Sequence, residues 1–226
     1  MVQVPQVVVF DVNETLSDLT PLGNRFEEAG LPAHLMPVWF AGVLRDGFAL
    51  TVSGAYADFA DVAADVLRDM LSGADDRHKD VEAVVRHVLD GFGELRCHPD
   101  VAPGMRRLCE AGIRLFTLTN GAAALTERLL ESEGLLALVE RRLDVSAPRA
   151  WKPSPAAYQY VAGEAGVRPE LMALAAVHPW DVDGAQRAGL VGAWLNRGDK
   201  PYPRVMAAPR VQAPSLPALA TELLQE

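Results

Sequence analysis

Four short apolar runs, separated by segments with a helical pattern, most constrain the fold of this 226-residue chain. The runs cover residues 7–10, 113–118, 172–177 and 191–195. Each is apolar on both faces, as are strands buried on both sides of a parallel sheet. Helical patterns lie near residues 122–132 and 155–163, and residues 144–145 are expected to form a further short strand. This alternation predicts an α/β fold with a doubly wound parallel sheet.

The long stretch between the first two runs, residues 19–97, contains no convincing strand pattern. Apolar residues recur there at helical spacing instead, at Tyr56, Phe59, Ala60, Ala63, Leu67 and Leu71, then at Val81, Val84, Val85 and Val88. A structureless loop of this length would be unusual inside a compact domain. We therefore predict an inserted helical cap domain over residues 17–97, and a core formed by residues 1–16 and 98–226. Such a cap would cover the carboxyl ends of the strands, where ligands bind in open α/β sheets.

Charge and cysteine content argue against several classes of protein. The formal net charge is −9, whereas a basic face is expected for binding to nucleic acids or anionic membranes. Cys97 and Cys109 lack the spacing of a zinc site or a disulfide framework. Neither a signal-peptide pattern nor an apolar run near the roughly 18 residues of a spanning helix is visible. We expect a cytoplasmic protein without nucleic-acid or membrane partners.

Polar residues follow the predicted strands at the points where each strand ends. Asp11, Asn13 and Thr15 follow the first run, and Thr119 and Asn120 follow the second. Burying a carboxylate at such a position is costly unless it is paired or needed for chemistry.

The later segments supply further polar groups. Lys152 precedes the helical pattern at 155–163, and His178, Trp180 and Asp181 follow the third run. Because the carboxyl ends of parallel strands meet at one edge of a sheet, all these side chains are expected to gather there.

In these segments the chain resembles the haloacid dehalogenase superfamily, and within it the type II 2-haloacid dehalogenases. The resemblance is carried by residues 10–16 (FDVNETL), residues 118–121 (LTNG), Lys152-Pro153 with Tyr158, and residues 180–185 (WDVDGA) running into Ala188-Gly189. The matches come in the family's order and spacing over the whole length. The resemblance implies a Rossmann-like core with a helical cap, and a hydrolase that uses no cofactor.

The resemblance also implies roles for the polar residues. Asp11 would be a nucleophile that attacks a saturated carbon and forms an aspartyl ester. Lys152 would lie against Asp11 and hold it ionised, because a nearby ammonium favours the charged form. Thr15 and Thr119 would donate hydrogen bonds to Asp11 or to a substrate carboxylate.

The remaining implied roles concern the leaving group, the water and the pocket. The Asn120 amide could bind a departing halide, and Asp181 would help place the water that hydrolyses the ester. Phe59 matches the aromatic residue that the family's cap presents to the leaving group. The other residues implied to shape the substrate pocket are Val12, Asn13, Tyr158 and Trp180.

Two departures from the superfamily's phosphatases argue against a magnesium-dependent phosphatase. Phosphatases carry a second aspartate two residues after the nucleophile, where this chain has Asn13, and an amide cannot protonate a leaving alkoxide. A further carboxylate that binds Mg²⁺ is replaced by the apolar Val177, although Mg²⁺ requires oxygen ligands. We therefore expect no metal.

Two other departures concern the substrate. Type II dehalogenases bind the halide or carboxylate with an arginine early in the cap. Here the matching region reads Phe40-Ala41-Gly42, so Arg45 is the nearest candidate, one helical turn from Gly42. His178 stands where an asparagine is expected, and it could contact the substrate or act as general base for the hydrolytic water.

The preferred prediction is hydrolytic dehalogenation of a 2-haloacid to a 2-hydroxyacid through an ester on Asp11. The partners would be a small carboxylic acid and halide, and a homodimer stays open because relatives commonly form one. The alternatives are a magnesium-dependent phosphatase of the same superfamily, a ring-opening hydrolase of a strained small acid, and a non-catalytic small-acid binder.

Overall fold

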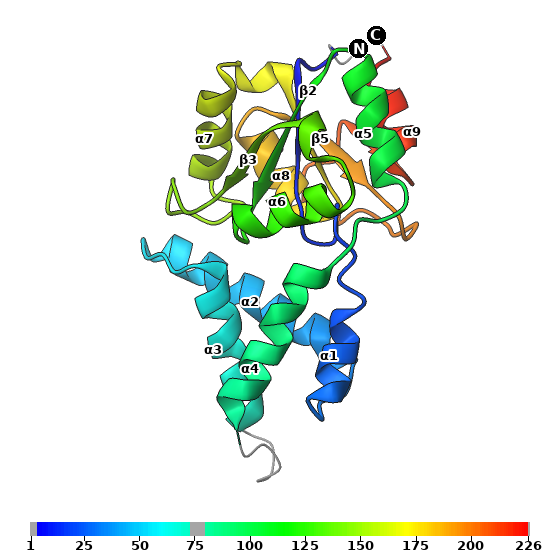
Figure 1. Ribbon diagram of the computed structural model, residues 1–226. Coiled ribbons are helices and arrows are strands. Elements are labelled where there is room, and N and C mark those ends of the chain that lie inside the picture. Colours follow the sequence, from blue (N-terminus) through cyan, green and yellow to red (C-terminus); the bar gives the residue numbers. More distant parts are fainter. Residues whose placement is uncertain (1–3, 73–79, 226) are drawn as a thin grey trace.

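The structure, a computed structural model, describes residues 4–72 and 80–225. At its centre six strands pair in parallel in the order β3-β2-β1-β4-β5-β6 (Figure 1). The strands are β1 (Val7–Phe10), β2 (Arg114–Thr119), β3 (Val139–Asp144), β4 (Met172–Ala176), β5 (Val191–Leu195) and β6 (Val211–Ala213). The predicted fold class, a parallel α/β sheet, is confirmed.

Helices cover both faces of this sheet. They are α5 (Val101–Glu110), α6 (Ala123–Ser132), α7 (Pro155–Ala165), α8 (Pro179–Arg187) and α9 (Leu216–Leu223), with the short 3₁₀ segments η2 (Leu136–Leu138) and η3 (Pro169–Leu171). Successive side chains of β1 point to opposite faces. Val7 and Val9 join the apolar cluster that includes α7 and α8, while Val8 and Phe10 join the cluster that includes α5 and α9. Burial on both faces explains why β1 is apolar throughout.

Two edge strands differ from the sequence-based expectation. Strand β3 covers Val139–Asp144 instead of residues 144–145, and its middle carries the partly or fully exposed Glu140, Arg141 and Arg142. Strand β6, at the other edge, has only three residues and was not predicted. An edge strand has one open side and tolerates charged side chains, so neither strand shows the apolar run that marks a central strand.

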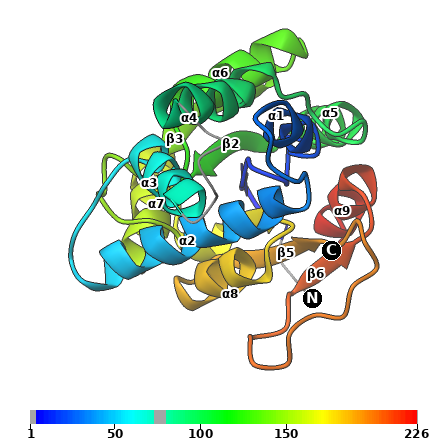
Figure 2. The same cartoon turned by 90° about the horizontal axis from the view of Figure 1, so that it is seen from below.

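A helical insertion lies between β1 and α5, at the carboxyl ends of the strands and below the sheet in Figure 1. It consists of α1 (Leu22–Glu28), α2 (Leu35–Val52), α3 (Phe59–Ser72), α4 (Val81–Asp90) and the 3₁₀ segment η1 (Gly91–Glu94). Figure 2 shows α2 running across this side of the sheet beside α8. The rings of Phe48 on α2 and Trp180 on α8 are 5.0 Å apart. The insertion therefore packs directly on the strand ends.

The two connections between the sheet and the insertion run side by side. The Asp18 amide donates to the Arg96 carbonyl oxygen (2.9 Å), and the His98 amide donates to the Leu16 carbonyl oxygen (2.9 Å). Ser17 and Cys97 form an antiparallel bridge between them. The chain thus enters and leaves the insertion at one place, only a few residues beyond Asp11.

Helix α2 is, among the described residues, the one helix long and apolar enough to cross a membrane by length and composition alone. The expectation concerned uninterrupted apolar runs, and the one that begins α2 ends at Leu44. Arg45 and Asp46 interrupt the apolar sequence of this helix, and its Trp39, Phe40 and Val43 are buried within the insertion. Core helices that pack in this way pass the same test.

Trp151 joins the sheet to the insertion. Its ring lies against Gly47 of α2, so closely that a Cβ there would be 2.3 Å from the ring. Its backbone amide donates to the Thr51 hydroxyl (3.0 Å), and its indole N–H donates to the Ala57 carbonyl oxygen (3.0 Å). The ring also stacks on Phe59, with centroids 5.9 Å apart. Since Lys152 is the next residue, these contacts fix the position of its backbone.

Candidate active site

Asp11, Lys152 and Asp181 form a buried chain of alternating charges at the strand ends. The Lys152 ammonium donates to Asp11 Oδ1 (2.8 Å) and to Asp181 Oδ2 (2.6 Å). Lys152 and Asp181 are 0% exposed and Asp11 is 4% exposed. Unpaired buried charges would be very costly, so the ammonium is the counterion that lets both carboxylates stay in the interior.

The charges set the ionisation of this chain. Burial raises the pKa of Asp11, but Lys152, His178 and the Thr15 hydroxyl together hold it below its usual value. Burial lowers the pKa of Lys152, yet the two carboxylates bring it above its usual value. At neutral pH, Asp11 is therefore an anion and Lys152 a cation, as a carboxylate nucleophile requires.

Asp181 lies on the other side of the ammonium, enclosed by donors. Its Oδ2 accepts from Lys152, and its Oδ1 accepts from the Tyr158 hydroxyl (2.6 Å). Burial, with the charge of Asp11, raises the pKa of Asp181. Tyr158 is also fully buried. The Tyr158 side chain packs behind Asp181 and supports it, and its role in shaping the substrate pocket stays a prediction.

Thr15 holds the second oxygen of Asp11. Its hydroxyl donates to Asp11 Oδ2 (2.6 Å), as predicted, and accepts from the Val177 amide (3.1 Å). Lys152 and Thr15 thus each donate a hydrogen bond to a different oxygen of the Asp11 carboxylate. This fixes the orientation of Asp11, which favours attack along one direction.

The Asn120 side chain holds the backbone of Lys152. Its Oδ1 accepts from the Lys152 backbone amide (2.8 Å), and its Nδ2 donates to the Lys152 carbonyl oxygen (3.2 Å). Both ends of the amide therefore hold the backbone of Lys152, which leaves one N–H for the halide that the sequence analysis assigns to Asn120. The Thr119 hydroxyl accepts from the Gly121 amide (2.9 Å) and makes no hydrogen bond to Asp11 in the described structure.

A small cavity of about 20 Å³ lies between the insertion and the strand ends. Predicted pocket residues from both parts line it, namely Val12, Asn13, Phe59 and Thr119. A volume of this size is close to that of one water molecule. The cavity is therefore too small to hold a haloacid as it stands.

His178 and Trp180 extend the site along α8. The His178 ring stacks on Trp180, with centroids 5.1 Å apart, and Trp180 contacts Phe48 of the insertion. His178 Nε2 lies 3.9 Å from Asp11 Oδ2 and 3.2 Å from the Asn13 carbonyl oxygen. The structure therefore brings the predicted histidine beside the nucleophile.

Arg45 lies outside the site. Its side chain is 71% exposed and forms a bidentate ion pair with Asp46. Gly42, one turn earlier on α2, faces Val66 of α3, and Arg45 lines a surface pocket with residues of the same helix. The structure does not bring Arg45 to Asp11, because the buried Val43 and Gly47 occupy the inward face of α2, and a contact of Arg45 with substrate stays a prediction.

Glu14 is a site residue that the sequence reasoning missed. Its Oε2 lies 3.3 Å from His178 Nε2, and its backbone adopts the left-handed conformation (φ 64°). A non-glycine residue with positive φ is uncommon and often marks a functional turn. Its position three residues after Asp11 was the only signal available in the sequence.

Clusters of possible metal ligands are not found in the part of the chain that the structure describes. The position between the two carboxylates, where a divalent cation would be held, is taken by the Lys152 ammonium. The ammonium thus stands between Asp11 and Asp181 and offsets part of their negative charge.

Replacing Tyr158 with phenylalanine is expected to destabilise the protein by about 1.5–3 kcal/mol, because a hydrogen bond to a buried carboxylate is lost. Urea unfolding at pH 7 measures the change. Tyr160→Phe, on the same helix but half-buried, is the matched control and should shift stability by about 0.5 kcal/mol or less. Equal effects of the two substitutions would show that Tyr158 does not support Asp181.

Comparison with known proteins gives consistent matches over nearly the whole chain. A family model described as haloacid dehalogenase-like hydrolase matches residues 5–189. (S)-2-haloacid dehalogenase 1 of Pseudomonas sp. (strain CBS-3) is 28% identical over 221 residues, 96% of each chain. Haloacetate dehalogenase H-2 of Moraxella sp. (strain B) is 24% identical over 220 residues, 95% of this chain and 96% of its own. A solved dehalogenase with an intermediate complex is 25% identical and aligns over 100% of both chains with a TM-score of 0.90.

Proposed function

The chain belongs to the haloacid dehalogenase-like hydrolase family, and from this premise we propose that it hydrolyses 2-haloacids to 2-hydroxyacids. The observation that carries the proposal is the Lys152 ammonium held between the buried carboxylates of Asp11 and Asp181. It keeps Asp11 anionic in the interior, where an unsolvated carboxylate is a strong nucleophile. Relatives of similar length that bear dehalogenase names support the same reaction.

In the first step, an Asp11 oxygen bonds to C2 of the acid and the carbon–halogen bond breaks, releasing halide with its electron pair. A halide needs no proton to leave, so Asn13 in place of an acid is sufficient. In the second step, water attacks Cγ of the Asp11 ester and the hydroxyacid departs with the former carboxylate oxygen. Inversion at C2 follows, because only the first step takes place at that carbon.

We assign residues 17–97 to the cap of this enzyme. The cap contributes Phe59 to the cavity next to Val12, Asn13 and Thr119. It also seats Trp151, the neighbour of Lys152. A closed cap excludes water while the ester forms, which protects the nucleophile and strengthens the electrostatic contacts. The cytoplasmic location, the absence of nucleic-acid and membrane partners, and a homodimer stay predictions.

We predict that halide release is independent of divalent cations. The assay uses chloroacetate, both enantiomers of 2-chloropropionate and fluoroacetate, each with and without EDTA. The rate is expected to be the same with and without the chelator, because Lys152 supplies the positive charge beside Asp11. Phosphate esters, assayed in parallel with Mg²⁺, should not be hydrolysed.

Loss of halide release with EDTA and recovery with Mg²⁺ would contradict the proposal. Hydrolysis of a strained-ring acid, without halide release from any haloacid, would assign the same site to ring opening instead.

A further inference from the structure

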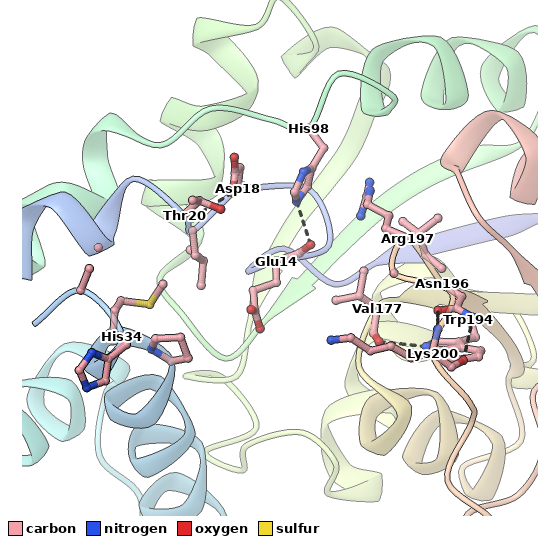
Figure 3. Close-up of a pocket in the computed structure, with 17 residues that line it drawn as sticks. Glu14, Asp18, Thr20, His34, His98, Val177, Trp194, Asn196, Arg197 and Lys200 are labelled. Carbon is pink, nitrogen blue, oxygen red and sulfur yellow. Dashed lines mark hydrogen bonds between the residues drawn. The ribbon is translucent and has the colours of Figure 1, made fainter.

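Helix α2 of the cap meets the core in two different ways along its length. At its N-terminal end, an open groove of about 600 Å³ separates the cap from the core, with His34 on the cap side and Lys200 on the core side (Figure 3). In its second half, the helix contacts the core directly, through Gly47 and Thr51 against Trp151. The cap is therefore seated on the core through Trp151.

The cap encloses both the ring and the backbone amide of Trp151, which is 0% exposed. The indole N–H donates to the Ala57 carbonyl oxygen, the ring stacks on Phe59, and the backbone amide donates to the Thr51 hydroxyl. A Cβ at Gly47 would lie 2.3 Å from the six-membered ring of the indole, so only glycine lets the ring lie this close. Hydrogen bonds and close packing together fix the position of Trp151 against the cap.

The loop that carries Trp151 makes a second contact with the cap. The Arg149 guanidinium lies over the ring of Tyr56, 4.9 Å from its centroid. A cation over an aromatic face is attracted by the negative charge of that face. The Tyr56 hydroxyl in turn donates to Asp58 (2.7 Å). The loop is thus attached to the cap at residues 149 and 151.

The peptide group that follows Trp151 belongs to Lys152 and is held by the core. Its N–H donates to Asn120 Oδ1 (2.8 Å). The Lys152 side chain is 0% exposed, and its ammonium donates to Asp11 and Asp181. Because Trp151 and Lys152 share a planar peptide group, a displacement of the first residue is passed on to the second.

We propose that Trp151 is a positioning residue through which the cap holds the Lys152 ammonium between Asp11 and Asp181. This role rests on the proposed dehalogenase function. It makes the cap a support for the nucleophile as well as a cover for the pocket. Trp151 acts through Lys152 and is not itself a catalytic residue.

The position of Lys152 decides how strongly Asp11 is kept ionised. Burial raises the pKa of Asp11, while Lys152, His178 and Thr15 bring it below its usual value. The attraction between the ammonium and the carboxylate weakens as their distance grows. A displaced lysine would therefore leave Asp11 with a higher pKa, and Asp11 would lose its nucleophilic form at a higher pH.

Two glycines of α2 give a matched pair of substitutions. In Gly47→Ala the new Cβ meets the Trp151 ring, whereas in Gly42→Ala it meets Val66 inside the cap, at 2.9 Å. Both variants add one methyl group to the same helix, so a general effect on the cap should appear in both. Gly47→Ala alone should lower kcat for halide release from chloroacetate about 10-fold or more, because small displacements of reacting groups are costly.

The pH profile of kcat/KM separates positioning from a merely structural role. In Gly47→Ala, halide release should be lost at a higher pH on acidification than in wild type, because Asp11 takes up its proton earlier. Gly42→Ala should keep the wild-type profile. The comparison is made over the pH range in which circular dichroism shows each protein to be folded.

Thr51 tests the same contact without a steric clash. Thr51→Val keeps the shape of the side chain but removes the hydroxyl that accepts from the Trp151 amide. Thr51→Ser keeps a hydroxyl at this position. The valine variant should show a lower kcat and the shifted pH profile, and the serine variant should resemble wild type in both.

Hydrogen exchange reports on the backbone of Lys152 without turnover. The Lys152 amide donates to Asn120 Oδ1, so its exchange rate shows whether this peptide group stays in place. Mass spectrometry with fragmentation of the peptide resolves this amide. Exchange at Lys152 should be faster in Gly47→Ala and Thr51→Val than in Gly42→Ala and Thr51→Ser.

Two results would overturn the proposal while the dehalogenase function stands. One is equal behaviour of Gly47→Ala and Gly42→Ala in halide release, pH profile and exchange. The other is a Thr51→Val enzyme with unchanged pH dependence and unchanged exchange at Lys152. Absence of halide from wild type with any haloacid would overturn the proposed function, and the exchange measurement would then still decide whether the cap holds Lys152.

Discussion

Replacing Lys152 with methionine is expected to abolish halide release and to lower the free energy of unfolding by about 3–5 kcal/mol at pH 7. The substitution keeps an unbranched side chain of similar length but removes the ammonium that both Asp11 and Asp181 share. Two carboxylates would then lie buried without a counterion, and at least one must take up a proton. A protonated Asp11 is no longer a nucleophile.

The stability lost in Lys152→Met is expected to depend on pH. In the wild type, Lys152 and the other neighbours hold the pKa of Asp11 below 3.8, so this carboxylate stabilises the fold above that pH and ceases to do so as the pH falls through the lower folded value. Without the ammonium, burial raises the pKa values of both aspartates. The variant should therefore lose stability as the pH rises from 4 to 7, and its deficit should be smaller at pH 4.

Urea unfolding of both proteins at pH 4 and pH 7 measures these differences. Lys200→Met, at an exposed lysine, is the control and should change the unfolding free energy by about 0.5 kcal/mol or less. A Lys152→Met protein as stable as the wild type at pH 7 would show that the buried charges are not coupled through this side chain.

Replacing Asp11 with asparagine should remove the chemistry and spare the fold. Halide release is expected to fall at least about 10⁴-fold, as for other nucleophile substitutions. Lys152 keeps Asp181 as its partner, and the asparagine oxygen can still accept from the ammonium. Urea unfolding should therefore change much less than in Lys152→Met.

Isotope labelling checks the identity of the nucleophile independently. In ¹⁸O-water, the product of the first turnover should contain unlabelled oxygen, which comes from Asp11. Repeated cycles should place label in the Asp11 carboxylate, found by mass spectrometry of the peptide. Label in the first-turnover product would mean that water attacks C2 directly and that Asp11 is not the nucleophile.

The strands could be predicted where both faces of the sheet are buried. The central strands β1, β2, β4 and β5 are apolar on both faces, so their sequence reports their position. Strand β3 could not be delimited because its edge position allows Glu140, Arg141 and Arg142. Strand β6 is a three-residue edge strand in a tail rich in proline, where no periodicity has room to emerge.

The site residues could be predicted where the order of the parallel strands alone brings them together. Asp11 and Lys152 are 141 positions apart, yet both follow the rule that strand ends share one edge, and the structure pairs them. The direction of the Arg45 side chain could not be predicted, because spacing along a helix does not reveal which face turns inward. The contact of Glu14 with His178 could not be predicted, because it depends on a left-handed turn that the residue type at this position does not indicate.

The seating of Trp151 limits how this enzyme could be recombined. Trp151, the residue before Lys152, belongs to the predicted core, but it donates hydrogen bonds to Thr51 and Ala57 of the helical insertion. Lids and catalytic cores are often treated as exchangeable modules. A cap taken from another protein would need a glycine facing the Trp151 indole and two hydrogen-bond acceptors for Trp151. Without them, the contacts that hold the backbone next to Lys152 would be lost.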